Sequence, residues 1–96
     1  MNMDFEIEFS VEKNQLLKET RRICFEDVIE LIQKELTIGD IKHHNQERYR
    51  KQRIFIISFK NYAYVIPYVI DKNKKTIFLK TIYPSRHFKK KYEKKL

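Results

Sequence analysis

The stretch RIFIISFKNYAYVIPYVIDKNKKTIFLKTIYP (residues 53–84) decides the fold of this 96-residue chain. It contains three apolar segments rich in β-branched and aromatic residues, at residues 53–59, 62–70 and 76–83. The pair Lys60-Asn61 and the polar run 71–75 separate these segments, and connections this short join antiparallel strands. Pro67 has no backbone N–H to donate, so we expect it at a bulge or at an edge of the sheet.

A short strand and a first helix precede this stretch. Apolar and acidic residues alternate over residues 5–9, which is the pattern of a half-buried strand. Ser10 is a good N-cap residue. It predicts a helix that runs to about Arg21, with Leu16 and Leu17 facing inward.

The strongest helical pattern in the chain comes next. Apolar residues at a helical spacing form a single stripe, which consists of Phe25, Val28, Ile29, Ile32 and Leu36. Cys24 stands at the N-cap position, and Asp27 follows three residues later as in a capping box. Cysteine is a weak cap, so we expect this helix start to be less stable than one capped by serine.

The remaining segments complete the predicted architecture. The only glycine, Gly39, is flanked by isoleucines and indicates a short strand or turn. Residues 42–53 are polar and cationic without an apolar period, which predicts a loop. Ser85 predicts the start of a final short basic helix that ends at about Lys94. We therefore expect an α+β fold in which two helices pack on one face of a twisted antiparallel sheet of three to four strands.

Length and charge limit the classes of function. With 42% hydrophobic residues, residues 1–96 are enough for one domain with a modest core. Residues 1–41 carry 5 Lys and Arg against 10 Asp and Glu, whereas residues 42–96 carry 16 against 3. A basic half of this strength predicts binding to a polyanion or to an acidic protein.

The chain shows no signal for secretion or membrane insertion. Its apolar runs are much shorter than a bilayer span, and the acidic start MNMDFEIEF lacks the basic region of a signal peptide. Cys24 is the only cysteine, so an intrachain disulfide is not possible. We expect a cytoplasmic protein without a membrane partner.

Three stretches of the chain form a recognisable pattern when taken in order. They are EKNQLLKETRRICFEDV (residues 12–28), NQERYRKQRIF (residues 45–55) and IFLKTIYPSR (residues 77–86). Their order and spacing resemble the BrnT-like toxins of the RelE/ParE-like superfamily, which belong to bacterial type II toxin–antitoxin systems. The resemblance covers about residues 5–92.

This resemblance implies a RelE-like fold and a small metal-independent endoribonuclease that stops translation without a cofactor. It also implies a cognate antitoxin that silences the toxin, and binding to operator DNA only through the antitoxin complex. Arg86 and Arg53 match arginines of the family pattern, and Phe9 stands where the family usually has tryptophan. Arg21-Arg22 replaces His-Gly or Arg-Gly, and arginine is costly at the left-handed position of a helix C-cap.

Cleavage of RNA without a metal needs a base for the 2′-hydroxyl, cations for the phosphorane and an acid for the leaving oxygen. Arg86 suits the cationic role because its planar fork matches two phosphate oxygens. Arg53 and Lys80 are expected to converge with it from neighbouring strands. Histidine titrates near neutral pH, which makes His87 a candidate base or acid. Tyr92 is a candidate stacking platform or acid.

Further cations are expected to bind the RNA backbone, namely Arg48, Lys51, Lys89, Lys90 and Lys91. An exposed Tyr62 or Tyr64 is a candidate platform for stacked bases. The adjacent His43 and His44 point apart on a strand and have no third ligand at a suitable spacing, so we predict no metal site.

Structural interpretations stay open beside the functional ones. Arg86 is also consistent with a surface ion pair, Lys80 with a solvated strand residue and Tyr92 with a packing residue of an amphipathic helix. Three classes of function remain. They are an endoribonuclease toxin that acts on free or ribosome-bound RNA, a non-catalytic nucleic-acid-binding module, and a ParE-like toxin that acts by protein contact.

Overall fold

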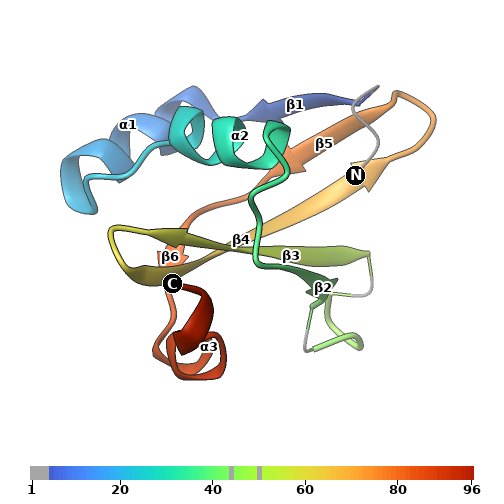
Figure 1. Ribbon diagram of the computed structural model, residues 1–96. Helices are drawn as coiled ribbons and strands as arrows, with labels where there is room; N and C mark the ends of the chain where they lie inside the picture. The colour runs from blue at the N-terminus through green and yellow to red at the C-terminus, as the bar shows by residue number, and fades with distance from the viewer. Residues whose placement is uncertain (1–4, 44, 50) are drawn as a thin grey trace.

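Six strands form one mixed sheet in the computed structural model, which describes residues 5–43, 45–49 and 51–96 (Figure 1). The strand order is β1 (Glu6–Phe9), β5 (Thr76–Leu79), β4 (Tyr62–Asp71), β3 (Gln52–Phe59) and β2 (Gly39–Lys42). The short β6 (Tyr83–Pro84) also pairs with β4. The central strand of the sheet is therefore β4.

The α+β class is confirmed, but the predicted antiparallel sheet of three to four strands is too small. β1 joins the sheet at its edge and pairs in parallel with β5, with Ile7 beside Ile77. The other pairings are antiparallel. Short turns dictate the antiparallel order of β3, β4 and β5, whereas no local turn links β1 to its partner, so its direction cannot be read from the sequence around it.

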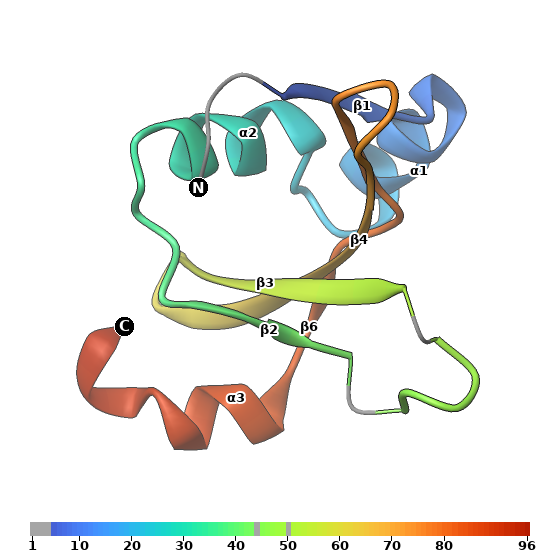
Figure 2. The ribbon, with the colours of Figure 1, turned by 90° about the vertical axis from the view of Figure 1, so that its right-hand side faces the viewer.

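Helices cover both faces of the sheet (Figures 1 and 2). The helices α1 (Val11–Thr20) and α2 (Phe25–Gln33) lie on one face, as predicted. The basic helix α3 (Arg86–Lys91) and the 3₁₀ turn η1 (Glu93–Lys95) lie on the opposite face. Successive residues of β3 and β4 point to opposite faces of the sheet and so fill two cores. Phe55, Ile57, Ile66 and Tyr68 pack under α1 and α2, whereas Ile54, Ile56, Ala63 and Val65 pack against α3.

Both predicted serine caps are present. The Ser10 hydroxyl oxygen accepts the backbone N–H of Lys13, and the Ser85 hydroxyl oxygen accepts that of Phe88, each at 3.2 Å. At the start of α2, a carboxylate oxygen of Asp27 accepts the Cys24 backbone N–H at 3.3 Å. These contacts satisfy amides that a helix start leaves unpaired.

Two leucines predicted to face the core are exposed instead. Leu17 is buried, but Leu16 is 50% exposed, because neighbouring helical residues point about 100° apart and only one of them meets the sheet. Leu36 is 56% exposed and lies beyond the end of α2 at Gln33. Glu35 adopts a φ of 57°, a left-handed conformation that ends the helical stripe before Leu36.

The predicted strand over residues 76–83 is wrong, because a β-bulge divides it into β5 and β6. The register on β4 changes by one residue across this break: Leu79 pairs with Tyr68, but Tyr83 pairs with Val65. Three residues of the bulged chain therefore face two residues of β4.

Pro67 is one of the two β4 residues opposite this bulge, as its missing N–H predicts. Its carbonyl oxygen accepts the Lys80 backbone N–H at 2.8 Å. The nitrogen and carbonyl of a strand residue point to the same edge, so the proline nitrogen also faces the bulge. The ladder between β4 and β3 consequently loses no hydrogen bond.

The two hairpin turns also lie where the sequence predicts them. Lys60 and Asn61 have φ values of 52° and 63°, as a two-residue type I′ turn requires, and they join β3 to β4. The run that follows Asp71 joins β4 to β5, and Lys75 closes it with a φ of 54°. The predicted loop 42–53 is shorter than expected, since Lys42 and residues 52–53 belong to β2 and β3.

Asn14 ties α1 to the start of α2. Its side chain is buried; the carbonyl oxygen accepts the Phe25 backbone N–H, and the amide donates to a carboxylate oxygen of Glu26, both at 2.7 Å. The bond from Asn14 lowers the pKa of Glu26, with a smaller contribution from the ammonium of Lys18 at 3.8 Å. One buried amide therefore fixes how the two helices meet.

We expect Arg22→Gly to raise the free energy of unfolding by about 0.5–1 kcal/mol. Arg22 has a φ of 54° at the end of α1, where a Cβ is strained and glycine is not. Urea denaturation measures the change. Arg22→Ala is the matched control, because it removes the charge but keeps the Cβ. An equal gain from both variants would assign the effect to charge and contradict the backbone explanation.

We expect Asn14→Asp to lower the free energy of unfolding by about 1–3 kcal/mol, because a buried donor is lost and a carboxylate is placed beside Glu26. The new carboxyl has a raised folded-state pKa, so the loss should shrink as the pH falls and protonation removes the repulsion. Gln15→Glu, an exposed change on the same helix, is the control. Urea titrations of both variants at several pH values test this, and equal losses would contradict it.

Candidate nucleic-acid interface

A hollow beside α3 gathers three cations, one aromatic ring and one carboxylate. Of the described residues, its lining consists of Tyr62, Arg86, Lys89, Lys90 and Glu93. We call it the α3 hollow, and its volume is about 570 Å³. The predicted RNA-binding residues Lys89 and Lys90 thus lie beside the predicted catalytic Arg86.

Helical periodicity brings these side chains together. At about 3.6 residues per turn, residues three, four and seven apart share one face, and the α3 hollow uses this spacing from Arg86 onward. The opposite stripe, with Phe88 and Tyr92, packs against the core of β3 and β4. The Ser85 backbone N–H donates to the Ala63 carbonyl at 3.0 Å, which fixes the start of α3 beside β4.

Tyr62 supplies the aromatic surface of the α3 hollow. The Lys89 ammonium lies 5.1 Å from the centre of its ring, a cation–π distance. Tyr64 meets the same ring edge-on at 6.1 Å but packs against the core under α1 and α2. Of the two tyrosines considered for base stacking, Tyr62 is the one beside the cations.

His87 follows Arg86 in sequence but is not among the described residues that line the α3 hollow. Consecutive residues of a helix point about 100° apart. The exposed imidazole of His87 instead meets the ring of Phe88 edge-on at 5.0 Å. Adjacency to Arg86 in the sequence therefore does not place His87 in the α3 hollow.

Tyr92 packs beneath α3 and contacts the core, which favours its structural interpretation. Its hydroxyl lies 3.3 Å from the position that a Cβ on Gly39 would take, and the Ile56 side chain lies 2.8 Å from that position. A larger residue at this position of β2 would therefore require these two side chains to shift. The ammonium groups of Lys91 and Lys95 lie 5.8 and 5.7 Å from the Tyr92 ring centre.

Neither Lys80 nor Arg53 lines the α3 hollow with Arg86. Lys80 is exposed and lies in the bulge, so its predicted mid-strand position is wrong. Arg53 pairs with Tyr68, which is six residues along β4 from Tyr62 and therefore about 20 Å from it. The predicted catalytic arginines occupy opposite ends of the sheet.

Arg53 connects β2, β3 and β4. Its Nε donates to Asp40 Oδ1 at 3.1 Å and to the Tyr68 hydroxyl at 3.2 Å, and its Nη2 donates to the Asp40 carbonyl at 2.9 Å. The Tyr68 hydroxyl in turn donates to Asp40 Oδ1 at 2.5 Å. Burial and then the Asp40 carboxylate raise the pKa of Tyr68, while the bond with Tyr68 raises the pKa of Arg53. These bonds give Arg53 a structural role.

The other predicted RNA-binding residues are spread over the chain. Arg48 is exposed in the loop before β3, with its guanidinium 5.4 Å from the Tyr49 ring centre. Lys51 is exposed at the end of that loop. Glu93 also lines the α3 hollow and was not predicted as a site residue, although its spacing of seven residues from Arg86 in a predicted helix was a usable signal.

His43 has a structural environment. Its side chain is buried, its Nδ1 accepts the Asn45 backbone N–H at 3.1 Å, and its ring lies 4.4 Å from that of Tyr49. His44 falls outside the described residues. Within the part of the chain that the structure describes, no three His, Cys, Asp or Glu side chains gather as metal ligands would.

Comparison with known proteins gives no match for this chain among protein-family models, curated proteins or solved structures. The described helices include none that is long and apolar enough to cross a membrane. Neither a family nor a relative therefore assigns a role to the α3 hollow.

We expect Tyr68→Phe to lower the free energy of unfolding by about 1.5–3 kcal/mol, because the lost hydroxyl bonds to a charged carboxylate and a guanidinium. Tyr64→Phe is the matched control, since the Tyr64 side chain is linked to its surroundings by ring packing. Thermal and urea unfolding measure both. Similar losses from the two variants would show that the bonds with Asp40 and Arg53 contribute no net stability.

Proposed function

We propose that this chain is the toxin of a bacterial type II toxin–antitoxin system, with a RelE-like fold, and that it cleaves single-stranded RNA without a metal or cofactor. One observation carries the proposal: three cations and the ring of Tyr62 line the same hollow, with the Lys89 ammonium over that ring. Proteins that bind single-stranded RNA combine cations for the phosphates with an aromatic ring for a base. The resemblance to BrnT-like toxins supplies the class of protein.

The α3 hollow contains groups for each step of metal-free cleavage. In the proposed reaction, the Glu93 carboxylate takes the proton of the 2′-hydroxyl, and the freed oxygen attacks the adjacent phosphorus. Arg86 stabilises the charge that develops on the phosphorane. The bond between phosphorus and the 5′-oxygen then breaks, and this oxygen takes a proton from the ammonium group of Lys89 or Lys90. The products are a 2′,3′-cyclic phosphate and a free 5′-hydroxyl.

The proposal includes a cognate antitoxin and a cytoplasmic site of action. A cationic site is most simply silenced by an acidic or polar segment that covers it, so we expect the antitoxin to cover the α3 hollow. Operator DNA would then be bound only by the antitoxin complex. The substrate is RNA, free or on the ribosome.

A non-catalytic RNA-binding module is the second candidate, and one observation favours it. Arg53 and Lys80, both predicted to converge with Arg86, do not line the α3 hollow. A binding module needs the cations and the ring of the α3 hollow but no proton transfer. Cleavage and binding assays on the same variants separate the two candidates.

We expect Arg86→Ala to lower the rate of RNA cleavage by about 10²–10³, as the loss of one oriented stabilising donor does. The variant should fold normally because Arg86 is exposed. The measurement is single-turnover cleavage with EDTA present, and circular dichroism confirms folding. Lys94→Ala, a nearby charge change outside the lining of the α3 hollow, should keep the parent rate. Unchanged cleavage by Arg86→Ala would sink the catalytic role.

We expect Glu93→Gln to slow cleavage strongly and His87→Gln to leave it within about threefold, because only Glu93 lines the α3 hollow. Glu93→Gln removes a negative charge and should bind RNA at least as tightly as the parent. Both rates are measured with RNA that carries one 2′-deoxy residue as a blocked control. A rate loss confined to His87→Gln would assign the proton transfer to the histidine.

A further inference from the structure

A second group of cations lies at the other end of β4. Lys42 at the end of β2, Lys51 before β3 and Lys72 after β4 surround a hollow that Arg53 also lines. Its volume is about 580 Å³ and its remaining lining is Gln46, Gln52 and Ile70, so the described lining contains no carboxylate. We call Lys42, Lys51 and Lys72 the far lysines.

Among the described residues, the far lysines carry unpaired charges, whereas the charge of Arg53 is paired with the Asp40 carboxylate. All three are exposed, and none forms an ion pair with a described residue. Arg53 is bound to Asp40 and Tyr68. Three uncompensated like charges around one hollow repel one another and favour an anionic ligand.

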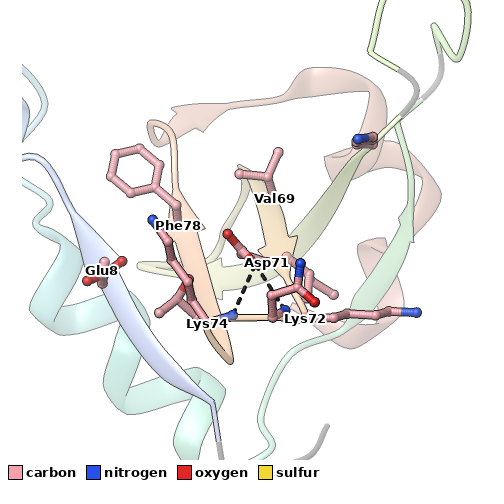
Figure 3. A pocket seen from close by; sticks show the side chains of 10 residues that line it. Glu8, Val69, Asp71, Lys72, Lys74 and Phe78 are labelled. Carbon is pink, nitrogen blue, oxygen red and sulfur yellow. Dashed lines mark hydrogen bonds between the residues drawn. The ribbon is translucent and has the colours of Figure 1, made fainter.

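Two acidic side chains near the far lysines form no ion pair with them in the described structure. Lys51 and Lys72 also border the open face of β1, β5 and β4, where Glu8 and Asp71 lie (Figure 3). A carboxylate oxygen of Asp71 accepts the backbone N–H groups of Asn73 and Lys74 at 3.0 and 3.1 Å. This carboxylate therefore caps the turn between β4 and β5.

The two cationic sites are separated by the length of β4. Tyr62 lies in the α3 hollow and Ile70 in the far one, and eight strand residues span about 26 Å. In Figure 1 the α3 end and the loop before β3 lie at opposite ends of the β3–β4 hairpin. One phosphate cannot reach both sites. If the RNA strand stacks with the spacing of one strand of duplex DNA, about 3.4 Å per nucleotide, about eight nucleotides bridge them.

We propose that the far lysines bind the backbone of the same RNA strand that the α3 hollow holds, at a distance of up to about eight nucleotides from Arg86. This inference rests on the proposed function and adds to it a minimum substrate length. Lysines suit the task because a flexible point charge accepts phosphates in several positions. Short RNA then occupies the α3 hollow alone, and longer RNA engages both sites.

The test compares uncleavable 2′-O-methyl oligouridylates of four and fourteen nucleotides by fluorescence anisotropy against salt. With three cations at each site and about 0.7 per phosphate contact, the longer strand should give a slope of log affinity against log salt of about −4. The triple variant Lys42→Ala, Lys51→Ala, Lys72→Ala should reduce this slope to about −2. It should also lower affinity for the longer strand about tenfold or more, while four-nucleotide binding stays near the parent value.

The control is a second triple variant with the same charge change, Lys13→Ala, Lys18→Ala, Lys34→Ala, on the helices of the other half. It should leave both oligonucleotides bound as in the parent, and thermal unfolding verifies that both triple variants fold. Equal losses from the two triple variants, or an equal loss for short and long strands, would overturn the inference. If Arg86→Ala weakens binding but the far-lysine variant does not, only the inference fails. If neither variant weakens binding, the proposed function fails as well.

Discussion

The bulge opposite Pro67 is the constraint on which the two-sided architecture depends. In a regular strand, residues two apart face the same side, so Tyr83 would share the face of Leu79. The extra residue reverses this order: Leu79 and Ile82 pack under α1 and α2, and Tyr83 packs on the other side. The chain consequently leaves the sheet on the uncovered face, where α3 docks and presents Arg86.

Charge placement follows from the same central strand. Helices α1 and α2 belong to the acidic half of the chain, whereas the basic half forms the hairpins and α3. Within the basic half, β4 holds the α3 hollow and the far lysines about 26 Å apart, well beyond the Debye length of about 8 Å at physiological salt. The two clusters therefore repel each other only weakly.

Local sequence signals predicted much of this fold, whereas contacts between residues distant in sequence could not be predicted. Period-two runs, Lys60-Asn61 and the serine caps gave both hairpins and the helix starts, because each depends on a few neighbouring residues. The missing N–H of Pro67 also predicted a bulge. The parallel pairing of β1 with β5 and the hydrogen bond from Arg53 to Asp40 join residues distant in sequence, and no local period encodes such contacts. Arg53 was therefore expected beside Arg86, although its Nε and Nη2 donate to residues of the sheet.

Arginine and lysine side chains differ in chemistry, and they occupy different kinds of position in this structure. A guanidinium holds fixed geometry through several directed bonds, and Arg53 uses this property to clamp three strands. Arg86 has the same fork on an exposed helix face beside Tyr62, which suits one phosphate held in one orientation. The far lysines are flexible point charges, which suit a backbone whose position varies with sequence. Under the proposed function, the α3 hollow thus orients the RNA for cleavage, while the far lysines contribute only to the affinity for RNA.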